Sequence, residues 1–297
     1  MGTAAVIPAP PNPAGLLLLA AALLWLASPV LAAGATHACH AVSGTATRPL
    51  VELYTSEGCS SCPPADRWLA ATFGDAAAPV ATTPVATTPA PVRSVAMRGS
   101  GRAIAIALHV DYWDRLGWVD RFATHANTRR QYAAMRAKAA SFVYTPQVLL
   151  QGRDFPAWRE PDVRATIAAA AARPPRAALA LDATVAGGEV DVRAEAQVDD
   201  AALRGDARLF VAYVDSGLHS DVGGGENRGH RLTHDHVVRA LQPAGAADAV
   251  GGIHARLVFE RPAEAGSMPT LVAFVQRRSD GDVLQALALP LAACGAP

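Results

Sequence analysis

Residues 49–66, PLVELYTSEGCSSCPPAD, join an apolar strand pattern to a Cys-x-x-Cys pair. The run at 50–55 predicts a β-strand, and a Ser-Glu-Gly turn follows it. Cys59 opens a helix that is expected to reach about Phe73, because the two prolines after Cys62 are tolerated only in a first helical turn. A Cys-x-x-Cys pair that follows a strand and opens a helix is typical of a thioredoxin-like redox site.

The residues downstream continue the alternation of strands and helices. Residues 103–110 are almost continuously apolar, as expected of a buried parallel strand. The other predicted elements are a loop at 111–118, helices at 124–140 and 162–172, a strand at 147–150, and a turn with a short edge strand at 152–158. The order β-α-β-α-β-β-α predicts an α/β sheet with right-handed crossovers. Together with the Cys-x-x-Cys pair between its first strand and helix, we expect a thioredoxin-like domain over residues 49–175.

Beyond residue 175 the pattern changes to strands separated by glycine turns. Apolar and polar residues alternate at 179–185. Further strand patterns lie at 190–192, 209–214, 255–259, 271–276 and 283–289, with little helix between them. Residues 176–297 therefore predict a smaller, antiparallel β-rich domain.

The amino terminus has the pattern of a secretory signal peptide over residues 1–35. An unbroken apolar run at 15–27 ends at Ser28-Pro29 and gives way to small residues. An uncleaved anchor is the alternative, because the apolar stretch is about as long as a membrane-crossing helix. No later segment is long and apolar enough to span a bilayer. We expect an exported protein, periplasmic or secreted, with an N-terminal tail at 36–48 and no stable membrane span after cleavage.

Composition separates one further segment and excludes one class of partner. Residues 75–102 are rich in Ala, Thr and Pro and contain the repeated sequence PVATT, so they predict a low-complexity, disordered insertion in the thioredoxin-like domain. The whole chain has 297 residues with 26 basic and 26 acidic groups. This balance argues against nucleic acid as the main partner, because phosphate binding needs clustered Lys and Arg.

The Cys-x-x-Cys pair predicts thiol–disulfide exchange. Cys59 at a helix N-terminus meets unpaired backbone N–H groups and the positive end of the helix dipole, which both stabilise a thiolate. Cys62, one turn along, can close a disulfide or resolve a mixed disulfide. We therefore predict Cys59 as nucleophile and Cys62 as resolving thiol, with no organic cofactor. The alternatives are half of a zinc site, for which no second Cys-x-x-Cys exists, and an inert structural disulfide.

Three long motifs carry a family resemblance. The segments VELYTSEGCSSCPPAD at 51–66, LHVDYWDRLGWVDRFA at 108–123 and VYTPQVLLQG at 143–152 resemble the DUF1223 family of exported bacterial proteins, which is placed among thioredoxin-like folds. The segment GENRGHRLTH at 225–234 resembles the second half of the same family. The resemblance implies a fold more firmly than a reaction, because the family name states an unknown function.

A thioredoxin-like fold implies a cis-proline loop beside the cysteines, and Thr145-Pro146 resembles that loop. The loop would let an extended substrate chain pair with the backbone before Pro146, although an ordinary trans-proline at a strand start is the alternative. Tyr112 and Trp113, together with Trp118, are candidates for an apolar rim that binds substrate, or else are core aromatics.

Titratable residues near the pair are candidates for proton transfer. Glu52, in the first strand, is the predicted buried acid that takes the proton of Cys62, with Glu57 as a weaker substitute and a solvated strand charge as the alternative. His109, at the end of the second strand, predicts a proton relay, a metal ligand together with the two thiols, or a hydrogen-bonded structural group.

Two other patterns remain. The residues from Gly223 to His236 contain three histidines, but no third metal ligand stands at a diagnostic spacing, so we interpret them as a polar loop of the β-rich domain. Cys39 and Cys294 predict a structural disulfide that joins the chain ends in an oxidising compartment.

The sequence thus predicts an exported thiol–disulfide oxidoreductase-like protein that acts on protein thiols or disulfides. The alternative from another class is a non-catalytic envelope binding protein. Such a protein would handle copper through Cys59, Cys62 and His109, or would keep the Cys-x-x-Cys as a structural disulfide.

Overall fold

The computed structural model describes residue 2 and residues 37–74, 82–85, 92–95, 103–137, 140–264 and 266–295. The chain divides into two units, residues 1–35 and 36–297, and every helix and strand of the described residues lies in the second. The predicted signal peptide falls outside the described residues, apart from Gly2. Among the described residues, none of the helices has the length and apolar character needed to cross a membrane.

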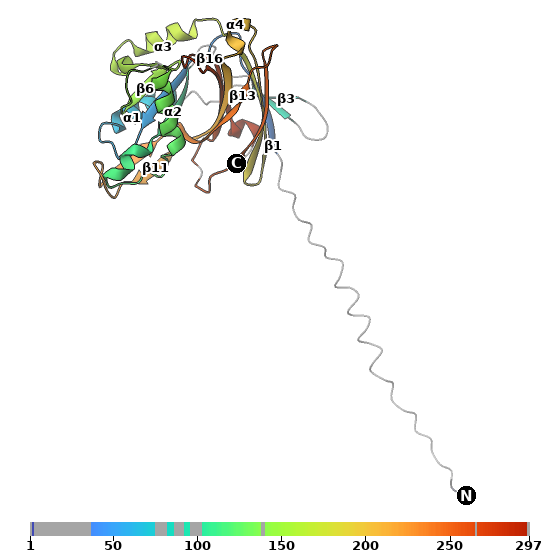
Figure 1. Ribbon diagram of the computed structural model, residues 1–297. Helices are drawn as coiled ribbons and strands as arrows, with labels where there is room; N and C mark the ends of the chain where they lie inside the picture. The colour runs from blue at the N-terminus through green and yellow to red at the C-terminus, as the bar shows by residue number, and fades with distance from the viewer. Residues whose placement is uncertain are drawn as a thin grey trace. The chain divides into compact units, whose positions relative to one another are not determined.

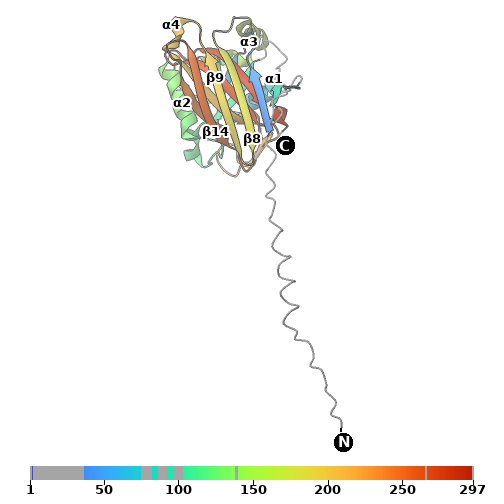
Figure 2. The same cartoon turned by 90° about the vertical axis from the view of Figure 1, so that its right-hand side faces the viewer.

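The second unit is a sheet-rich α/β fold with two large mixed sheets. The larger sheet has eight strands in the order β16 (Val283–Pro290), β15 (Thr270–Arg277), β10 (Ala207–Asp215), β13 (Val237–Ala246), β5 (Ile104–His109), β2 (Leu50–Thr55), β6 (Gln147–Leu150) and β7 (Arg153–Asp154). The smaller sheet has six strands in the order β14 (Gly252–Glu260), β9 (Glu189–Gln197), β8 (Ala178–Ala186), β1 (His37–Val42), β4 (Val92–Val95) and β3 (Thr82–Val85). Figure 2 shows β8, β9 and β14 side by side.

A hairpin and several helices complete the unit. The hairpin pairs β11 (Leu218–Asp221) with β12 (Arg231–His234). The α-helices are α1 (Pro63–Phe73), α2 (His125–Arg136), α3 (Val163–Ala171) and α4 (Ala201–Arg204). Short 3-10 helices are η3 (Asp111–Leu116), η4 (Pro156–Arg159) and η5 (Leu291–Cys294). The predicted strands and helices over residues 49–175 are therefore observed in the expected order, with η3 in place of the expected loop and with two further strands, β3 and β4, between α1 and β5.

Strand β2 separates two cores, because its successive side chains point to opposite faces of the sheet. Val51 and Leu53 face α1 and α3, where they pack with residues such as Leu69 and Ile167. On the opposite face, Leu50 and Tyr54 pack in a core with Ile106, Val214 and Phe274. That second core draws on both halves of the sequence.

The sheet crosses the boundary predicted at residue 175. Strand β13 pairs in parallel with β5 through Val237 and Ala107, and the amide of Ala107 donates a hydrogen bond to His236 O at 2.7 Å. The division at residue 175 therefore marks a change of sequence pattern, whereas the eight-stranded sheet is continuous across it (Figure 1).

Two segments differ from the sequence-based expectation. The predicted N-terminal tail contains strand β1. Its residues Cys39 and Ala41 are buried in the core between the two sheets. Within the predicted disordered insertion, β3 and β4 are described as strands, and β4 pairs in parallel with β1. The remainder of residues 75–102 lies outside the described residues.

Candidate functional site

The centre of the candidate site is the disulfide between Cys59 and Cys62, whose Cα atoms are 5.5 Å apart. Cys62 is the residue before α1, and its carbonyl accepts hydrogen bonds from the amides of Ala65 and Asp66 in the first turn. Both cysteines are buried, with 1% and 0% of their surface exposed, although the intervening serines are exposed. The chain around the cysteines therefore decides what can reach the sulfur atoms.

Trp113 connects this turn to the predicted proline loop. The Thr145–Pro146 peptide bond is cis, and Trp113 Nε1 donates a hydrogen bond to Thr145 Oγ1 at 2.7 Å. On its other side Trp113 packs against Gly58, since a Cβ atom added to Gly58 would lie only 3.1 Å from Trp113 Cβ. A single side chain thus bridges the turn before Cys59 and the loop that carries Pro146.

Tyr112 supports the same loop from behind. Its hydroxyl donates a hydrogen bond to Gln131 Oε1 at 3.3 Å, and burial raises the pKa of Tyr112 to about 12. Gln131 Nε2 in turn donates to Tyr144 O and to Gln147 Oε1, on both sides of the cis bond. The half-buried Tyr112 therefore orients the loop through α2.

Glu57 is the buried carboxylate closest in sequence to the cysteines. Its oxygen atoms accept hydrogen bonds from Trp118 Nε1 at 2.7 Å and from His234 Nε2 at 3.1 Å. Burial by itself raises the pKa of Glu57, but the hydrogen bond from His234, with smaller ones from Ser220 and Trp118, lowers it below its ordinary value. Glu57 is therefore held as an anion below the Cys-x-x-Cys turn.

His109 forms a second buried pair next to Glu57. Its Nδ1 donates to Asp120 Oδ2 at 2.6 Å, and the same oxygen accepts the Glu57 amide at 2.9 Å. Burial by itself lowers the pKa of His109, but the charge and hydrogen bond of Asp120 raise it above its ordinary value. Burial by itself raises the pKa of Asp120, but the charge and hydrogen bond of His109 lower it below its ordinary value.

The two pairs meet at the face of α1 that follows Cys62. The His109 and His234 rings lie 5.0 Å apart in a T-shaped contact. Asp66, on the first turn of α1, accepts a hydrogen bond from Thr55 Oγ1 at 3.2 Å. Burial raises the pKa of Asp66 above its ordinary value, although His109 and His234 act in the opposite direction. Ionisable groups from α1, β5, β12 and two connecting loops thus share one electrostatic site beside the helix start.

Glu52, the predicted proton acceptor, is not part of this site. It lies on the face of β2 opposite the face that packs on α1, and its carboxylate pairs with Arg130 at 2.8 Å and accepts a hydrogen bond from Tyr54. Arg130 also packs on the stacked rings of Phe210 and Phe274. Alternation along the strand fixes the face, and Arg130 of α2 neutralises the buried charge there.

The predicted polar loop lies against the Cys-x-x-Cys turn. Residues 222–230 form the tip of the β11–β12 hairpin, closed by a hydrogen bond from Gly229 N to Val222 O at 2.7 Å. We call these residues the strap. Asn227 Nδ2 donates to Glu57 O at 2.8 Å and to Cys59 O at 3.0 Å, and Glu226 Oε2 accepts from the Ser60 amide and hydroxyl at 2.9 and 2.7 Å. The strap therefore holds the Cys-x-x-Cys turn directly.

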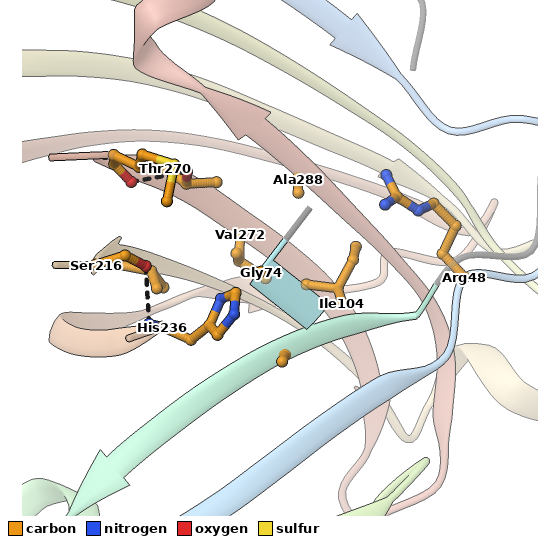
Figure 3. Close-up of a pocket in the computed structure, with 11 residues that line it drawn as sticks. Arg48, Gly74, Ile104, Ser216, His236, Thr270, Val272 and Ala288 are labelled. Carbon is orange, nitrogen blue, oxygen red and sulfur yellow. Dashed lines mark hydrogen bonds between the residues drawn. The ribbon is translucent and has the colours of Figure 1, made fainter. Parts of the chain in front are cut away.

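His236 diverges from His234, although only one residue separates them. It adopts a left-handed backbone conformation with φ of 59°, and its amide donates to Ser216 Oγ at 2.9 Å. Figure 3 shows its ring at a pocket lined also by Ile104, Val272 and Ala288. Burial lowers the pKa of His236. This pocket shares no lining residue with the Cys-x-x-Cys turn.

The remaining cysteines are also joined. Cys39 of β1 and Cys294 of η5 form a disulfide with Cα atoms 4.7 Å apart, across a separation of 255 residues. Among the described residues, no three His, Cys, Asp or Glu side chains are grouped so that they could hold a metal ion.

Several residues that complete the site are assigned no role in the sequence analysis. Asp120 lies inside the quoted motif at 108–123, and Asn227 and His234 lie inside the motif at 225–234. The grouping of these polar residues in long specific motifs was the available signal. Their partners, however, are up to 177 residues away in the chain.

The family is established by the extent of the match. A family model described as a protein of unknown function, DUF1223, matches residues 50–276. The chain belongs to the DUF1223 family. The match includes the Cys-x-x-Cys turn, the cis-proline loop and the strap. No curated protein matches the chain.

Two solved structures are similar to this DUF1223 protein. The crystal structure of protein AGR_C_4864 from Agrobacterium tumefaciens has 26% sequence identity and a TM-score of 0.51, with 83% of this chain and 96% of that chain covered. HBP35 of Porphyromonas gingivalis has 12% identity and a TM-score of 0.54, with 83% and 76% covered. The second likeness shows the fold alone.

Proposed function

We propose that this protein is an exported thiol–disulfide oxidoreductase with a thioredoxin-like domain, and that it acts on protein thiols or disulfides in the periplasm or outside the cell. The observation that carries the proposal is the place of the Cys59–Cys62 bond. It lies directly before α1, and Trp113 bridges its turn to the cis Thr145–Pro146 loop. A helix start favours a thiolate, which is the reactive form.

The proposed exchange uses two sulfur atoms in sequence. A substrate thiolate attacks Cys59 Sγ and forms a mixed disulfide, while the Cys59–Cys62 bond breaks and Cys62 leaves as a thiolate that takes up a proton. A second substrate thiolate attacks the substrate sulfur of the mixed disulfide, which releases the substrate disulfide and leaves Cys59 as a thiolate. The two electrons that reduce the pair come from the two substrate thiols. The reverse sequence reduces a substrate disulfide.

The buried pairs supply the proton for the second sulfur atom. Asp66 lies one helical turn after Cys62, and burial raises its pKa. Asp120 raises the pKa of His109 and so favours its protonated form, with an Nδ1 to Oδ2 distance of 2.6 Å. We assign to these groups the proton transfer with Cys62 that the sequence analysis predicts for Glu52.

Protein substrates are supported by the surface next to the site. Leu116 and Val119 are 49% and 70% exposed and flank Trp118, the donor to Glu57. Exposed apolar side chains on either side of Trp118 offer contacts to an extended peptide. They offer little to a small charged thiol such as glutathione.

Burial favours a second candidate, a structural disulfide. Both Cys59 and Cys62 are covered to at least 99%, and a bond that no reagent reaches acts only as a cross-link. The two candidates differ in whether a dithiol reduces this bond in the folded protein.

The experiment compares wild type with Cys59→Ser in two assays, dithiol-driven reduction of insulin and oxidative refolding of a reduced test protein. We expect Cys59→Ser to abolish both activities, because it removes the sulfur that forms the mixed disulfide. The double variant Cys39→Ser/Cys294→Ser is the matched control and retains activity. A wild-type Cys59–Cys62 bond that stays oxidised in millimolar dithiol under native conditions would overturn the proposal.

A further inference from the structure

The strap is hydrogen-bonded to the turn that carries the disulfide which the proposed exchange must open. Cys59 is 1% exposed, yet its neighbour Ser60 is exposed and in contact with Glu226. Asn227 is itself buried and spans two carbonyl groups on either side of Gly58, those of Glu57 and Cys59. Two strap side chains therefore make four hydrogen bonds to the short turn that carries the nucleophile.

The strap also packs tightly against residues 117 and 118, and these contacts do not involve the cysteines. A Cβ atom added to Gly224 would lie 2.2 Å from Gly117 O, and one added to Gly223 would lie 3.2 Å from the Trp118 ring. Trp118 is in turn bound to Glu57. The glycine run thus lets the strap backbone lie directly on the loop before Asp120, and this explains a motif that the proposed exchange does not use.

We propose that Glu226 and Asn227 are positioning residues that hold the Cys-x-x-Cys turn in its closed, disulfide-bonded form and limit access to Cys59, so that a substrate must displace the strap before exchange begins. This proposal rests on the proposed function. It assigns to a hairpin from the second half of the chain the control of a reaction at the start of α1.

Glu226 adds an electrostatic effect to the steric one. Its carboxylate accepts the amide of Ser60, which directly follows Cys59. A negative charge at this position opposes formation of the Cys59 thiolate after reduction, because like charges disfavour the ionised form. Removing the charge while keeping the side-chain shape should therefore make Cys59 a stronger acid.

The test measures reduction of each disulfide in the intact protein by dithiothreitol, with mass tags that count free thiols. Asn227→Leu keeps a similar side-chain size and removes both donated hydrogen bonds without adding a charge, and Glu226→Gln removes only the charge. The Cys39–Cys294 bond is an internal control in every sample. Glu189→Gln, at an exposed position of β9, is the matched control for loss of an acidic side chain.

We expect Asn227→Leu to reduce at Cys59–Cys62 about tenfold faster than wild type, the effect of losing roughly one net hydrogen bond. The Cys39–Cys294 bond should reduce at an unchanged rate. We expect Glu226→Gln to lower the pH at which Cys59 is half-alkylated by iodoacetamide, with Glu189→Gln unchanged. If Asn227→Leu does not fold, Glu226→Gln still tests the proposal, because its side chain is exposed.

The outcomes separate the two proposals. Equal Cys59–Cys62 reduction rates and equal alkylation profiles in wild type and both strap variants overturn the role of the strap, and the insulin assay then still decides the proposed function. A bond that resists dithiothreitol in wild type and in the variants overturns both proposals. Faster reduction at both disulfides indicates general unfolding and also counts against the strap.

Discussion

At the scale of single residues, the site depends on charges that are buried in pairs. His109 and Asp120 are 1% and 2% exposed, and Glu57 with His234 repeats the arrangement. A buried ion pair contributes little net stability, but loss of one partner leaves an uncompensated charge in a poorly solvated site. The pairs are therefore sensitive points for both stability and proton transfer.

Asp120→Asn tests the His109 pair through its pH dependence. Because Asp120 raises the pKa of folded His109 above the unfolded value of about 6.5, the stabilisation is complete below that value and is lost as pH rises through the folded pKa. On the acid side, stabilisation by ionised Asp120 is lost as pH falls through its lowered pKa. We expect the variant to lose about 3 kcal/mol of unfolding free energy at pH 6, and less at higher pH.

Urea unfolding between pH 5 and pH 9 measures this effect. Asp191→Asn, at an exposed position of β9, serves as the control and should follow wild type at every pH. Parallel curves for wild type and Asp120→Asn over the whole range would contradict the assigned pairing.

At the scale of secondary-structure elements, the local patterns were informative and the distant contacts were not. The apolar runs and the paired prolines predicted β2, α1 and β5 to within a few residues. The face chosen by Glu52 followed from strand alternation, but its partner Arg130 is 78 residues away. The same applies to the strap, because nothing between Gly223 and Asn227 indicates that this loop contacts residues 57–60.

Gly224→Ala tests how closely the strap must fit. The added Cβ would lie 2.2 Å from Gly117 O. No side-chain rotation can separate these two atoms, so the backbone itself would have to shift. We expect a loss of about 1–3 kcal/mol, as for overpacking elsewhere, together with increased amide hydrogen exchange at residues 222–230. Gly188→Ala is the control, since its Cβ would meet no atom within 4 Å. Unchanged amide hydrogen exchange at the strap in Gly224→Ala would show that the strap does not pack tightly against Gly117.

At the scale of the whole molecule, the two sequence halves share one sheet and one core. The sequence predicts residues 49–175 as a separate domain because their α/β pattern ends at residue 175, where the alternating pattern begins. Pairing of β5 with β13 could not be predicted, because it joins strands of two different pattern classes. A short contact of this kind has no local signature, whereas each strand by itself does.

This sharing predicts that residues 49–175 do not form a stable domain alone. Without the second half, β5 loses its neighbour β13, and Arg130 loses its hydrogen bond to Gln276 and its contacts with Phe210 and Phe274. The apolar side chains around Tyr54 and Ile106 would then be exposed to water. This exposure costs about 25 cal/mol of folding free energy per Å² of apolar surface.

Far-UV circular dichroism during urea titration, applied to the 49–175 fragment and to residues 36–297, checks this expectation. The longer chain should unfold in one cooperative transition, since its cores are built from both halves. The fragment should show a weak, gradual change. A cooperative transition of the fragment, with a Cys59–Cys62 bond that reduces as in the whole protein, would instead identify residues 49–175 as an independent redox domain and the strap as an attachment added to it.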